Sequence, residues 1–232
     1  MQDVTLYQFA LCPFCHKVKA ALELKGIPYK TIEVNPMTKK ELPELPSNER
    51  AKVPVLKVGE KFIADSTEIL KFLETEDDSL TLEEPAQSKS MMVEEWVDDD
   101  LAQILPAVIY GKAKDAIRAA QVVAKTSNFG LVQNAVVRFG GSLIMNRVAQ
   151  KILARRGGGD AGLLLEAEMD KFEDWLGEQA FVGGEKLSVG DAAVHGCLTC
   201  IEDFPAFSKI MERQKVSAWY ERVSSQRKRL EA

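Results

Sequence analysis

Two cysteine pairs with the same spacing account for all the thiols of the chain. Cys12 and Cys15 stand in "FALCPFCHKVKAALELKG", and Cys197 and Cys200 stand in "CLTC". A Cys-x-x-Cys pair can bind a metal, close a structural disulfide or carry out thiol-disulfide chemistry. The residues around each pair indicate which of these roles it suits.

The first pair lies where a strand-like segment gives way to a helical one. Pro13 suits the first helical position, which places Cys12 at the N-terminus of the helix. A sulfur there faces unpaired backbone N–H groups and the positive end of the helix dipole, and both favour the thiolate. We therefore predict that Cys12 is a nucleophile and that Cys15 is a resolving or structural thiol. Lys17 and Lys19 are predicted to be solvated on an exposed face of this helix.

The second pair lies inside the apolar helical pattern "AAVHGCLTCI", where small buried thiols are common. We predict that Cys197 and Cys200 are inert core residues. A four-sulfur zinc site built from both pairs is the alternative, but structural zinc ligands usually stand on tight turns, so we predict no metal site. His16 has no orienting group in the sequence and is expected at the surface, and His195 is expected in the core or at an interface.

The composition narrows the classes of partner. The 232 residues include 30 Lys and Arg against 35 Asp and Glu, a net charge of -5 that gives no reason to expect nucleic acid. No apolar run is long enough to cross a bilayer, and no signal-like segment opens the chain. We expect a reducing compartment, the cytoplasm or an organelle if a transit peptide or membrane anchor has been removed.

The first third of the chain alternates strand-like and helical patterns. Residues 4–9 and 29–34 read as strands on either side of the helix that begins at Pro13, a β-α-β unit with parallel strands. The proline-rich residues 35–52 are irregular. Two short strands separated by Gly59 and Glu60 then predict a hairpin, followed by a helix with Ser66 as its N-cap.

The rest of the chain is helical in pattern. We predict an α/β domain over residues 1–76, an acidic linker over 77–87 and an all-α domain over 88–232. Ser188 and Asp191 stand three residues apart in "LSVGDAA", the spacing of a capping box at the start of a core helix.

In this order the segments resemble the glutathione transferase superfamily, with a glutaredoxin-like, thioredoxin-fold first half and a helical second half. The residues that carry the resemblance are "CPFC", "KVPVL" (52–56), Asp65 and Ser66 at a helix start, and "FVGGEKLSVGDAAVHG" (181–196). Most stretches are similar to the soluble part of the type-2, membrane-associated prostaglandin E synthase family. That family's membrane anchor has no counterpart in this sequence. Phe9 stands where the family often has a tyrosine, a departure that bears on endoperoxide isomerase activity more than on glutathione binding.

The resemblance implies a glutathione site made of Phe14, Val53, Pro54, Asp65 and Ser66. In this fold Pro54 follows a cis peptide bond, and the Val53 backbone pairs with the cysteinyl part of glutathione as an added strand. Asp65 would meet the glutamyl ammonium, while the Ser66 hydroxyl and the first amides of its helix suit the glutamyl carboxylate. The sulfur of the ligand would then lie near Cys12.

Together these patterns predict a glutathione-dependent transferase or thiol-disulfide oxidoreductase that acts on a small electrophile or disulfide. Two alternatives stay open: a prostaglandin endoperoxide isomerase proper, and a non-catalytic module that binds glutathione and haem. The resemblance also implies a homodimer, for which the apolar helix around residues 131–152 is a candidate interface.

Overall fold

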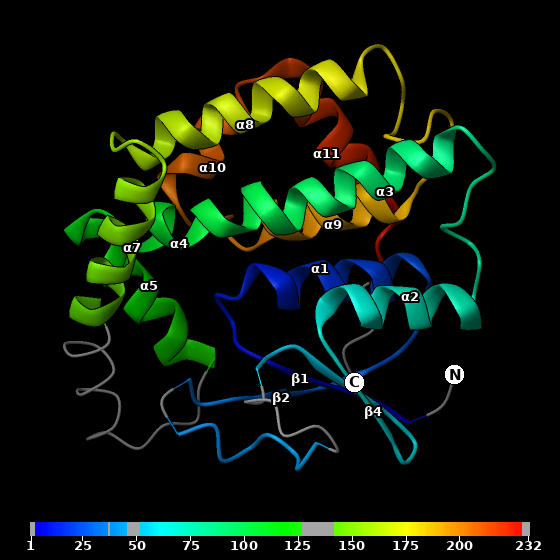
Figure 1. The fold of residues 1–232 in the computed structure, drawn as a ribbon, viewed down its shortest axis with the longest axis horizontal. Coiled ribbons are helices and arrows are strands. Elements are labelled where there is room, and N and C mark those ends of the chain that lie inside the picture. Colours follow the sequence, from blue (N-terminus) through cyan, green and yellow to red (C-terminus); the bar gives the residue numbers. More distant parts are fainter. Residues whose placement is uncertain (1–2, 37, 46–51, 127–141, 229–232) are drawn as a thin grey trace.

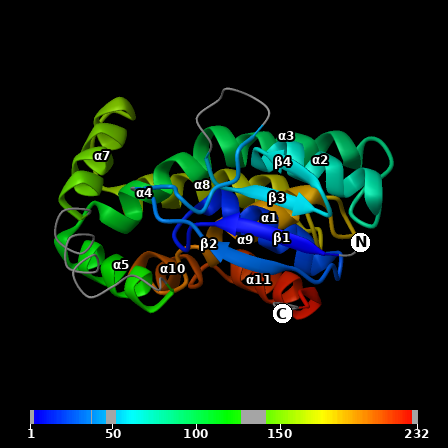
Figure 2. The same cartoon turned by 90° about the horizontal axis from the view of Figure 1, so that it is seen from below.

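A four-stranded mixed sheet opens the chain, and two helices lie on one of its faces (Figures 1 and 2). The structure is a computed structural model that describes residues 3–36, 38–45, 52–126 and 142–228. The strands have the spatial order β2-β1-β3-β4, with β1 parallel to β2 and antiparallel to β3. The elements are β1 (Val4–Gln8), α1 (Pro13–Leu24), β2 (Lys30–Glu33), β3 (Val55–Val58), β4 (Lys61–Ala64) and α2 (Ser66–Glu76). This confirms the predicted thioredoxin-like half, including the β3–β4 hairpin.

The second part of the chain is helical wherever it is described. Its elements are α3 (Ala86–Trp96), η1 (Val97–Leu101), α4 (Ala102–Tyr110), α5 (Ala113–Thr126), α7 (Ser142–Arg155), α8 (Ala161–Leu176), α9 (Val189–Thr199), α10 (Pro205–Ile210) and α11 (Gln214–Gln226). Residues 77–85, between α2 and α3, form no helix or strand. The proposed interface at 131–152 lies partly outside the described residues, and the homodimer and the domain limits stay predictions.

A single turn of π-helix, η1, joins α3 and α4 into one long helix (Figure 1). The amide of Ala102 donates to the Val97 carbonyl, five residues back, so the segment holds one residue more than an α-helical turn. Arg156, directly after α7, holds this turn, because its guanidinium donates to the Asp100 carboxylate at 2.7 Å and to the Asp99 carbonyl at 2.9 Å.

Helix α9 begins with the predicted capping box. The Ser188 side chain accepts from the Asp191 amide, and the Asp191 carboxylate accepts from the Ser188 amide at 3.0 Å. The same carboxylate also accepts from the Val182 amide at 2.9 Å and from the Trp219 indole at 2.7 Å. The Ser188 hydroxyl is a fourth donor, at 2.7 Å. Asp191 is fully buried, so these four donors are what make its burial tolerable.

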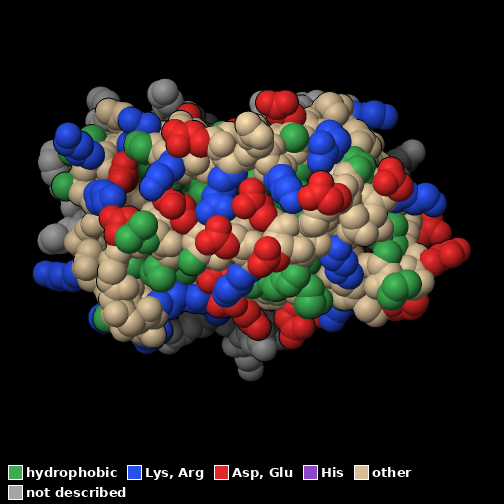
Figure 3. All heavy atoms as spheres, turned by 90° about the horizontal axis from the view of Figure 1, so that it is seen from above, with side chains coloured by type: hydrophobic (Ala, Val, Ile, Leu, Met, Phe, Trp, Pro, Cys, Tyr) green, Lys and Arg blue, Asp and Glu red, His purple; other side chains and the backbone are tan. Residues whose placement is uncertain are grey.

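The surface mixes charges of both signs. Figure 3 shows acidic and basic side chains interspersed over one face, with small apolar patches between them. Many of these charges form pairs, such as Arg213 with Asp170 and Glu173, both at 2.7 Å. Across the described parts of the chain, no helix is both long and apolar enough to span a bilayer.

Helix α1 lies between the sheet and α9, so it has no wide solvent face (Figure 1). The expectation that Lys17 is solvated is therefore wrong, since its side chain is 0% exposed; Glu23 on the same helix is 3% exposed. The two helices meet most closely at Gly196 of α9. A Cβ added there would lie 2.5 Å from the His16 carbonyl oxygen and 2.6 Å from the Lys17 Cα.

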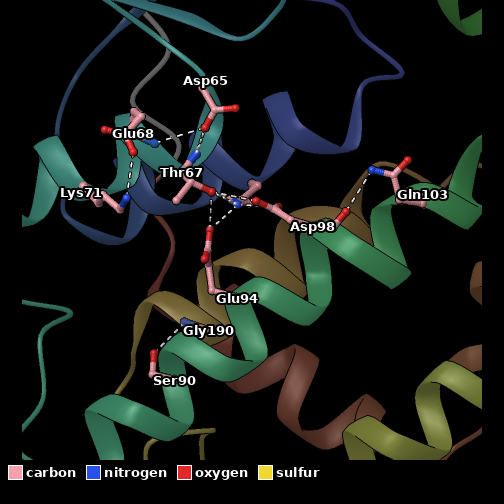
Figure 4. Close-up of polar contacts among 10 residues, drawn as sticks. Asp65, Thr67, Glu68, Lys71, Ser90, Glu94, Asp98, Gln103 and Gly190 are labelled. Carbon is pink, nitrogen blue, oxygen red and sulfur yellow. Dashed lines mark hydrogen bonds and ion pairs between the residues drawn. The ribbon is translucent and has the colours of Figure 1, made fainter.

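Buried ion pairs compensate the charges of α1. Lys17 Nζ lies 2.5 Å from Glu94 on α3 and 2.6 Å from Asp98 on η1. Thr67 on α2 points at the same two carboxylates, 2.9 Å from Glu94 and 2.7 Å from Asp98 (Figure 4). The network thus joins α1 and α2 of the first half to α3 and η1 of the second.

Candidate functional site

Cys12 lies at the junction of the sheet and α1, as its sequence context predicts. It is the N-cap of α1, and Pro13 is the first helical residue. The Cys12 amide donates to the Phe9 carbonyl at 3.0 Å, which closes the loop that leads from β1 into the helix. Cys12 is half-buried, whereas the other three cysteines are buried.

The surroundings of Cys12 favour its thiolate. Its pKa is lowered chiefly because the Cys15 thiol donates toward its sulfur, and the backbone amides of Cys15 and Phe14 act in the same direction. Burial and the Glu33 carboxylate oppose this shift. Burial raises the pKa of Cys15 well above its ordinary value, so the two thiols are clearly differentiated.

The second cysteine pair is buried on α9, as predicted. Burial raises the pKa of both Cys197 and Cys200, which keeps them protonated and unreactive. Because α9 packs against α1, Cys200 nevertheless lies near enough to Cys15 to contribute to the raised pKa of that thiol. Within the described residues, no cluster of three or more His, Cys, Asp or Glu side chains could hold a metal ion.

An apolar cavity of about 510 Å³ opens beside Cys12, between the first half of the chain and the helices α4, α5 and α7. Its walls are mainly aliphatic and aromatic, and Lys39 and Lys52 are the charged residues among those described. The lining residues are Phe9, Leu11, Cys12, Pro13, Phe14, Val34, Pro36, Lys39, Leu42, Lys52, Val53, Ala102, Gln103, Pro106, Tyr110, Ala119, Ala120, Val123 and Met145. Such a concave apolar site with few polar groups is typical of small-molecule binding.

The cavity brings together three of the predicted site residues, Cys12, Phe14 and Val53. Cys15 is fully buried on the inner side of α1 and does not line it. Pro54 is buried directly before β3, and its peptide bond with Val53 is cis, as the resemblance implies.

Asp65 and Ser66 begin α2, outside the cavity lining. The predicted N-cap is wrong by one residue: Asp65 is the N-cap, with φ 75°, and Ser66 is the first helical residue. The Asp65 carboxylate accepts from the amides of Thr67 at 2.9 Å and Glu68 at 3.3 Å (Figure 4). The amides of Thr67 and Glu68, expected to bind a ligand carboxylate, are therefore already paired with Asp65. Of the predicted donors at this helix start, the buried Ser66 and its hydroxyl are left for a ligand.

Sequence reasoning misses two residues that shape the loop before Cys12. Glu33, at the end of β2, accepts from the Ala10 amide at 2.7 Å and from Gln8 at 3.1 Å, and burial raises its pKa. Neighbouring parallel strands end at the same sheet edge, so the order of β1 and β2 could have placed it there. His16 was expected to lack an orienting group, yet its Nε2 lies 2.8 Å from the Ala10 carbonyl, because the first turn of α1 folds back over this loop.

Lys39 lines the cavity although the sequence does not predict it, and so do two polar residues of α4, Gln103 and Tyr110. The contact of these two α4 residues with the Cys12 region joins residues about a hundred positions apart along the chain, and no local pattern indicates it.

Comparison with known proteins matches both halves of the chain. The model of the glutathione S-transferase N-terminal domain matches residues 6–84, and the model of the C-terminal domain matches residues 164–227. The chain belongs to the glutathione transferase family. The predicted resemblance and the predicted fold class are thereby confirmed.

Proteins similar to this one in sequence or in fold span nearly the whole chain. Prostaglandin E synthase 2 of Mus musculus is 24% identical, over 95% of this chain and 69% of the mouse protein. The β-etherase LigF from Sphingobium sp. strain SYK-6 superimposes with a TM-score of 0.67 at 18% identity, over 97% of this chain and 96% of that one. Glutathione S-transferase-I, bound with lactoylglutathione, gives a TM-score of 0.64 at 17% identity, over 97% and 99%.

Proposed function

We propose that this glutathione transferase uses the Cys12 thiolate as a nucleophile toward a disulfide, a peroxide or another electrophile held in the apolar cavity. The observation that carries the proposal is the placement of Cys12: it caps α1, its pKa is lowered, and it lines the cavity. A thiolate combined with an open binding surface is what thiol-disulfide chemistry requires.

Glutathione is the proposed co-substrate, in line with the lactoylglutathione bound to the related transferase. The residues present fit the tripeptide at both ends of the site. Val53 lines the cavity beside Cys12 and offers its backbone, and Ser66 keeps a hydroxyl at the N-terminus of α2, where the helix dipole favours a carboxylate. Asp65 is exposed and could accept from an ammonium while it caps α2.

The reaction follows from the two thiols of the motif. The Cys12 sulfur attacks one sulfur of a disulfide and expels the other as a thiolate, which forms a mixed disulfide with the protein. A second thiolate, from glutathione, attacks this bond and releases Cys12. Cys15 is buried and its pKa is raised, so glutathione is better suited than Cys15 to the resolving step.

The test compares serine variants with a mixed disulfide of glutathione and a small thiol as substrate. Cys12→Ser should abolish turnover, whereas Cys15→Ser should keep most of it because glutathione can resolve the intermediate. Cys197→Ser, a buried thiol on α9, is the control for loss of a cysteine elsewhere. Turnover by a folded Cys12→Ser protein at the wild-type rate would contradict the proposal.

Two other functions remain as second candidates. Similarity to prostaglandin E synthase 2 favours an endoperoxide isomerase. Analysis of the products formed from a prostaglandin endoperoxide would test for this activity. A haem-binding module is favoured by the apolar cavity, where the Cys12 sulfur could bind the iron and Lys39 and Lys52 could meet the haem carboxylates. A Soret shift that is lost in Cys12→Ser would support the haem module.

A further inference from the structure

Tyr110, the last residue of α4, brings to the cavity a hydroxyl that the reaction above does not use. Its side chain is 7% exposed and lines the same cavity as Cys12. Among the residues that the structure describes, none forms a hydrogen bond with this hydroxyl. A buried tyrosine hydroxyl usually has a partner, so this one is free to donate to a bound molecule.

The geometry of α4 fixes where this hydroxyl lies. Gln103, Pro106 and Tyr110 follow one another at helical spacing and all line the cavity. Asn146 on α7 donates to the Tyr110 carbonyl at 2.8 Å, which satisfies a carbonyl left unpaired at the helix end. The Tyr110 backbone is thus held by α7, and its side chain is directed into the cavity rather than free at a helix terminus.

The protonation states of the two groups are complementary. Burial raises the pKa of Tyr110, and the nearby sulfurs of Cys200 and Cys12 raise it further, whereas the pKa of Cys12 is lowered. The cavity therefore holds a thiol that ionises more readily than an ordinary cysteine and a phenol that keeps its proton at neutral pH. A nucleophile and an acid in these states suit the attack on a bond whose leaving atom must be protonated.

The loop that leads into Cys12 supplies no phenol. Phe9 precedes Cys12 in the loop after β1 and lines the cavity with a ring that carries no hydroxyl. In this chain the phenol comes from the helical half instead.

We propose that Tyr110 is a catalytic residue that protonates the oxygen leaving when Cys12 attacks an apolar hydroperoxide. The inference rests on the proposed role of Cys12. The thiolate forms a bond to the terminal oxygen, the O–O bond breaks, and the alkoxide takes the Tyr110 proton to become an alcohol. The sulfur loses two electrons and becomes a sulfenic acid, the peroxide is reduced by two, and the phenolate regains a proton from water. Glutathione then condenses with the sulfenic acid to give a mixed disulfide and water.

The chemistry of the cavity selects this class of substrate. An alkoxide is a poor leaving group, and an apolar wall offers little water to protonate it, so a fixed donor has a large effect. A thiolate that leaves from a disulfide is a stable anion and needs no such help. Tyr110 should therefore matter for hydroperoxides and matter little for disulfides.

The test follows the first oxidation of Cys12 in the absence of glutathione, by trapping the sulfenic acid and measuring the mass of the protein. Tyr110→Phe should slow oxidation by cumene hydroperoxide by about a hundredfold. Oxidation by peracetic acid should continue at about the wild-type rate, because acetate leaves without a proton. Tyr7→Phe, a half-buried tyrosine of β1 whose ring lies 6.5 Å from Phe62, is the control and should behave as wild type.

Two results would overturn the inference. One is an unchanged rate with cumene hydroperoxide in Tyr110→Phe. The other is an equal loss with both oxidants, which would mean that Tyr110 only positions Cys12. Failure of the proposed function is a separate result, since it would appear as disulfide turnover in Cys12→Ser.

Discussion

Cys12 and Cys15 show how two chemically identical side chains become different within one helical turn. Both sulfurs belong to the same motif, but Cys12 is the N-cap residue of α1 and lines the cavity, whereas Cys15 is buried behind it. The Cys15 thiol donates toward the Cys12 sulfur, so the protonation of Cys15 supports the ionisation of Cys12. In this motif Cys15 therefore stays protonated and donates a hydrogen bond, and Cys12 is the thiol that ionises.

The pH dependence of Cys12 alkylation tests this account. Thiolate is the reactive form, so the rate rises with pH and is half-maximal at the pKa, which is lowered here from the ordinary value of a thiol. Cys15→Ala removes the main donor and should move the midpoint to higher pH. Glu33→Gln removes a charge that raises the pKa and should move it to lower pH. Iodoacetamide kinetics on the intact protein would measure both, and shifts in the same direction would contradict the assigned causes.

Much of this site could be predicted from local sequence. Pro13 and the strand before it indicate the position of Cys12, and the order of the segments indicates where Val53 and Asp65 fall. Predicting the place of Glu33 requires the order of the strands in the sheet. Predicting that of Tyr110 requires the packing of α4 against the first half of the chain, which no short sequence pattern indicates. Lys17 was mispredicted because helical periodicity distinguishes polar from apolar faces but does not show that both faces of α1 are covered.

At the scale of elements, the pairing of α1 with α9 organises both cysteine pairs. Gly196 permits this close approach, since a side chain there would meet backbone atoms of His16 and Lys17, which have no rotamer to change. The separation between α1 and α9 therefore depends on the absence of a side chain at Gly196. The same separation determines how closely the first turn of α1, which follows Cys12, packs against α9.

Gly196→Ala should destabilise the protein by about 1–3 kcal/mol, the usual cost of overpacking a core. Gly162→Ala in α8 is the matched control, because its added Cβ would meet only the movable carboxylate of Asp160 and alanine favours helix by about 1 kcal/mol. Denaturant unfolding of both variants would measure the difference. Equal stabilities would show that α1 and α9 separate without cost.

At the scale of the whole molecule, the two halves are joined by charges as well as by apolar packing. Lys17 contacts two carboxylates of the helical half, and Glu23 at the other end of α1 contacts Arg227 at 2.7 Å, just beyond α11. One buried helix of the first half therefore has an ionic contact with the second half near each end.

Lys17→Met should cost about 3–5 kcal/mol of unfolding free energy, because it leaves Glu94 and Asp98 without their cation in a buried site. Lys71→Met is the control: Lys71 pairs with Glu68 on the exposed face of α2, where solvent screening leaves such pairs little effect on stability (Figure 4). Chemical denaturation would compare the two. A loss in Lys17→Met no larger than in Lys71→Met would contradict the proposed importance of the buried network.

The π-turn η1 has a consequence for the cavity that lies beyond it. One residue of an α-helix corresponds to about 100° of rotation, so the additional residue in η1 sets the angular phase of α4 relative to α3. Asp98 faces Lys17 on one side of this turn, and Gln103, Pro106 and Tyr110 face the cavity after it. A chain shortened by one aspartate here would keep every side chain of α4 and present a different set of them to Cys12. The choice of α4 side chains that line the cavity therefore depends on the additional residue in η1.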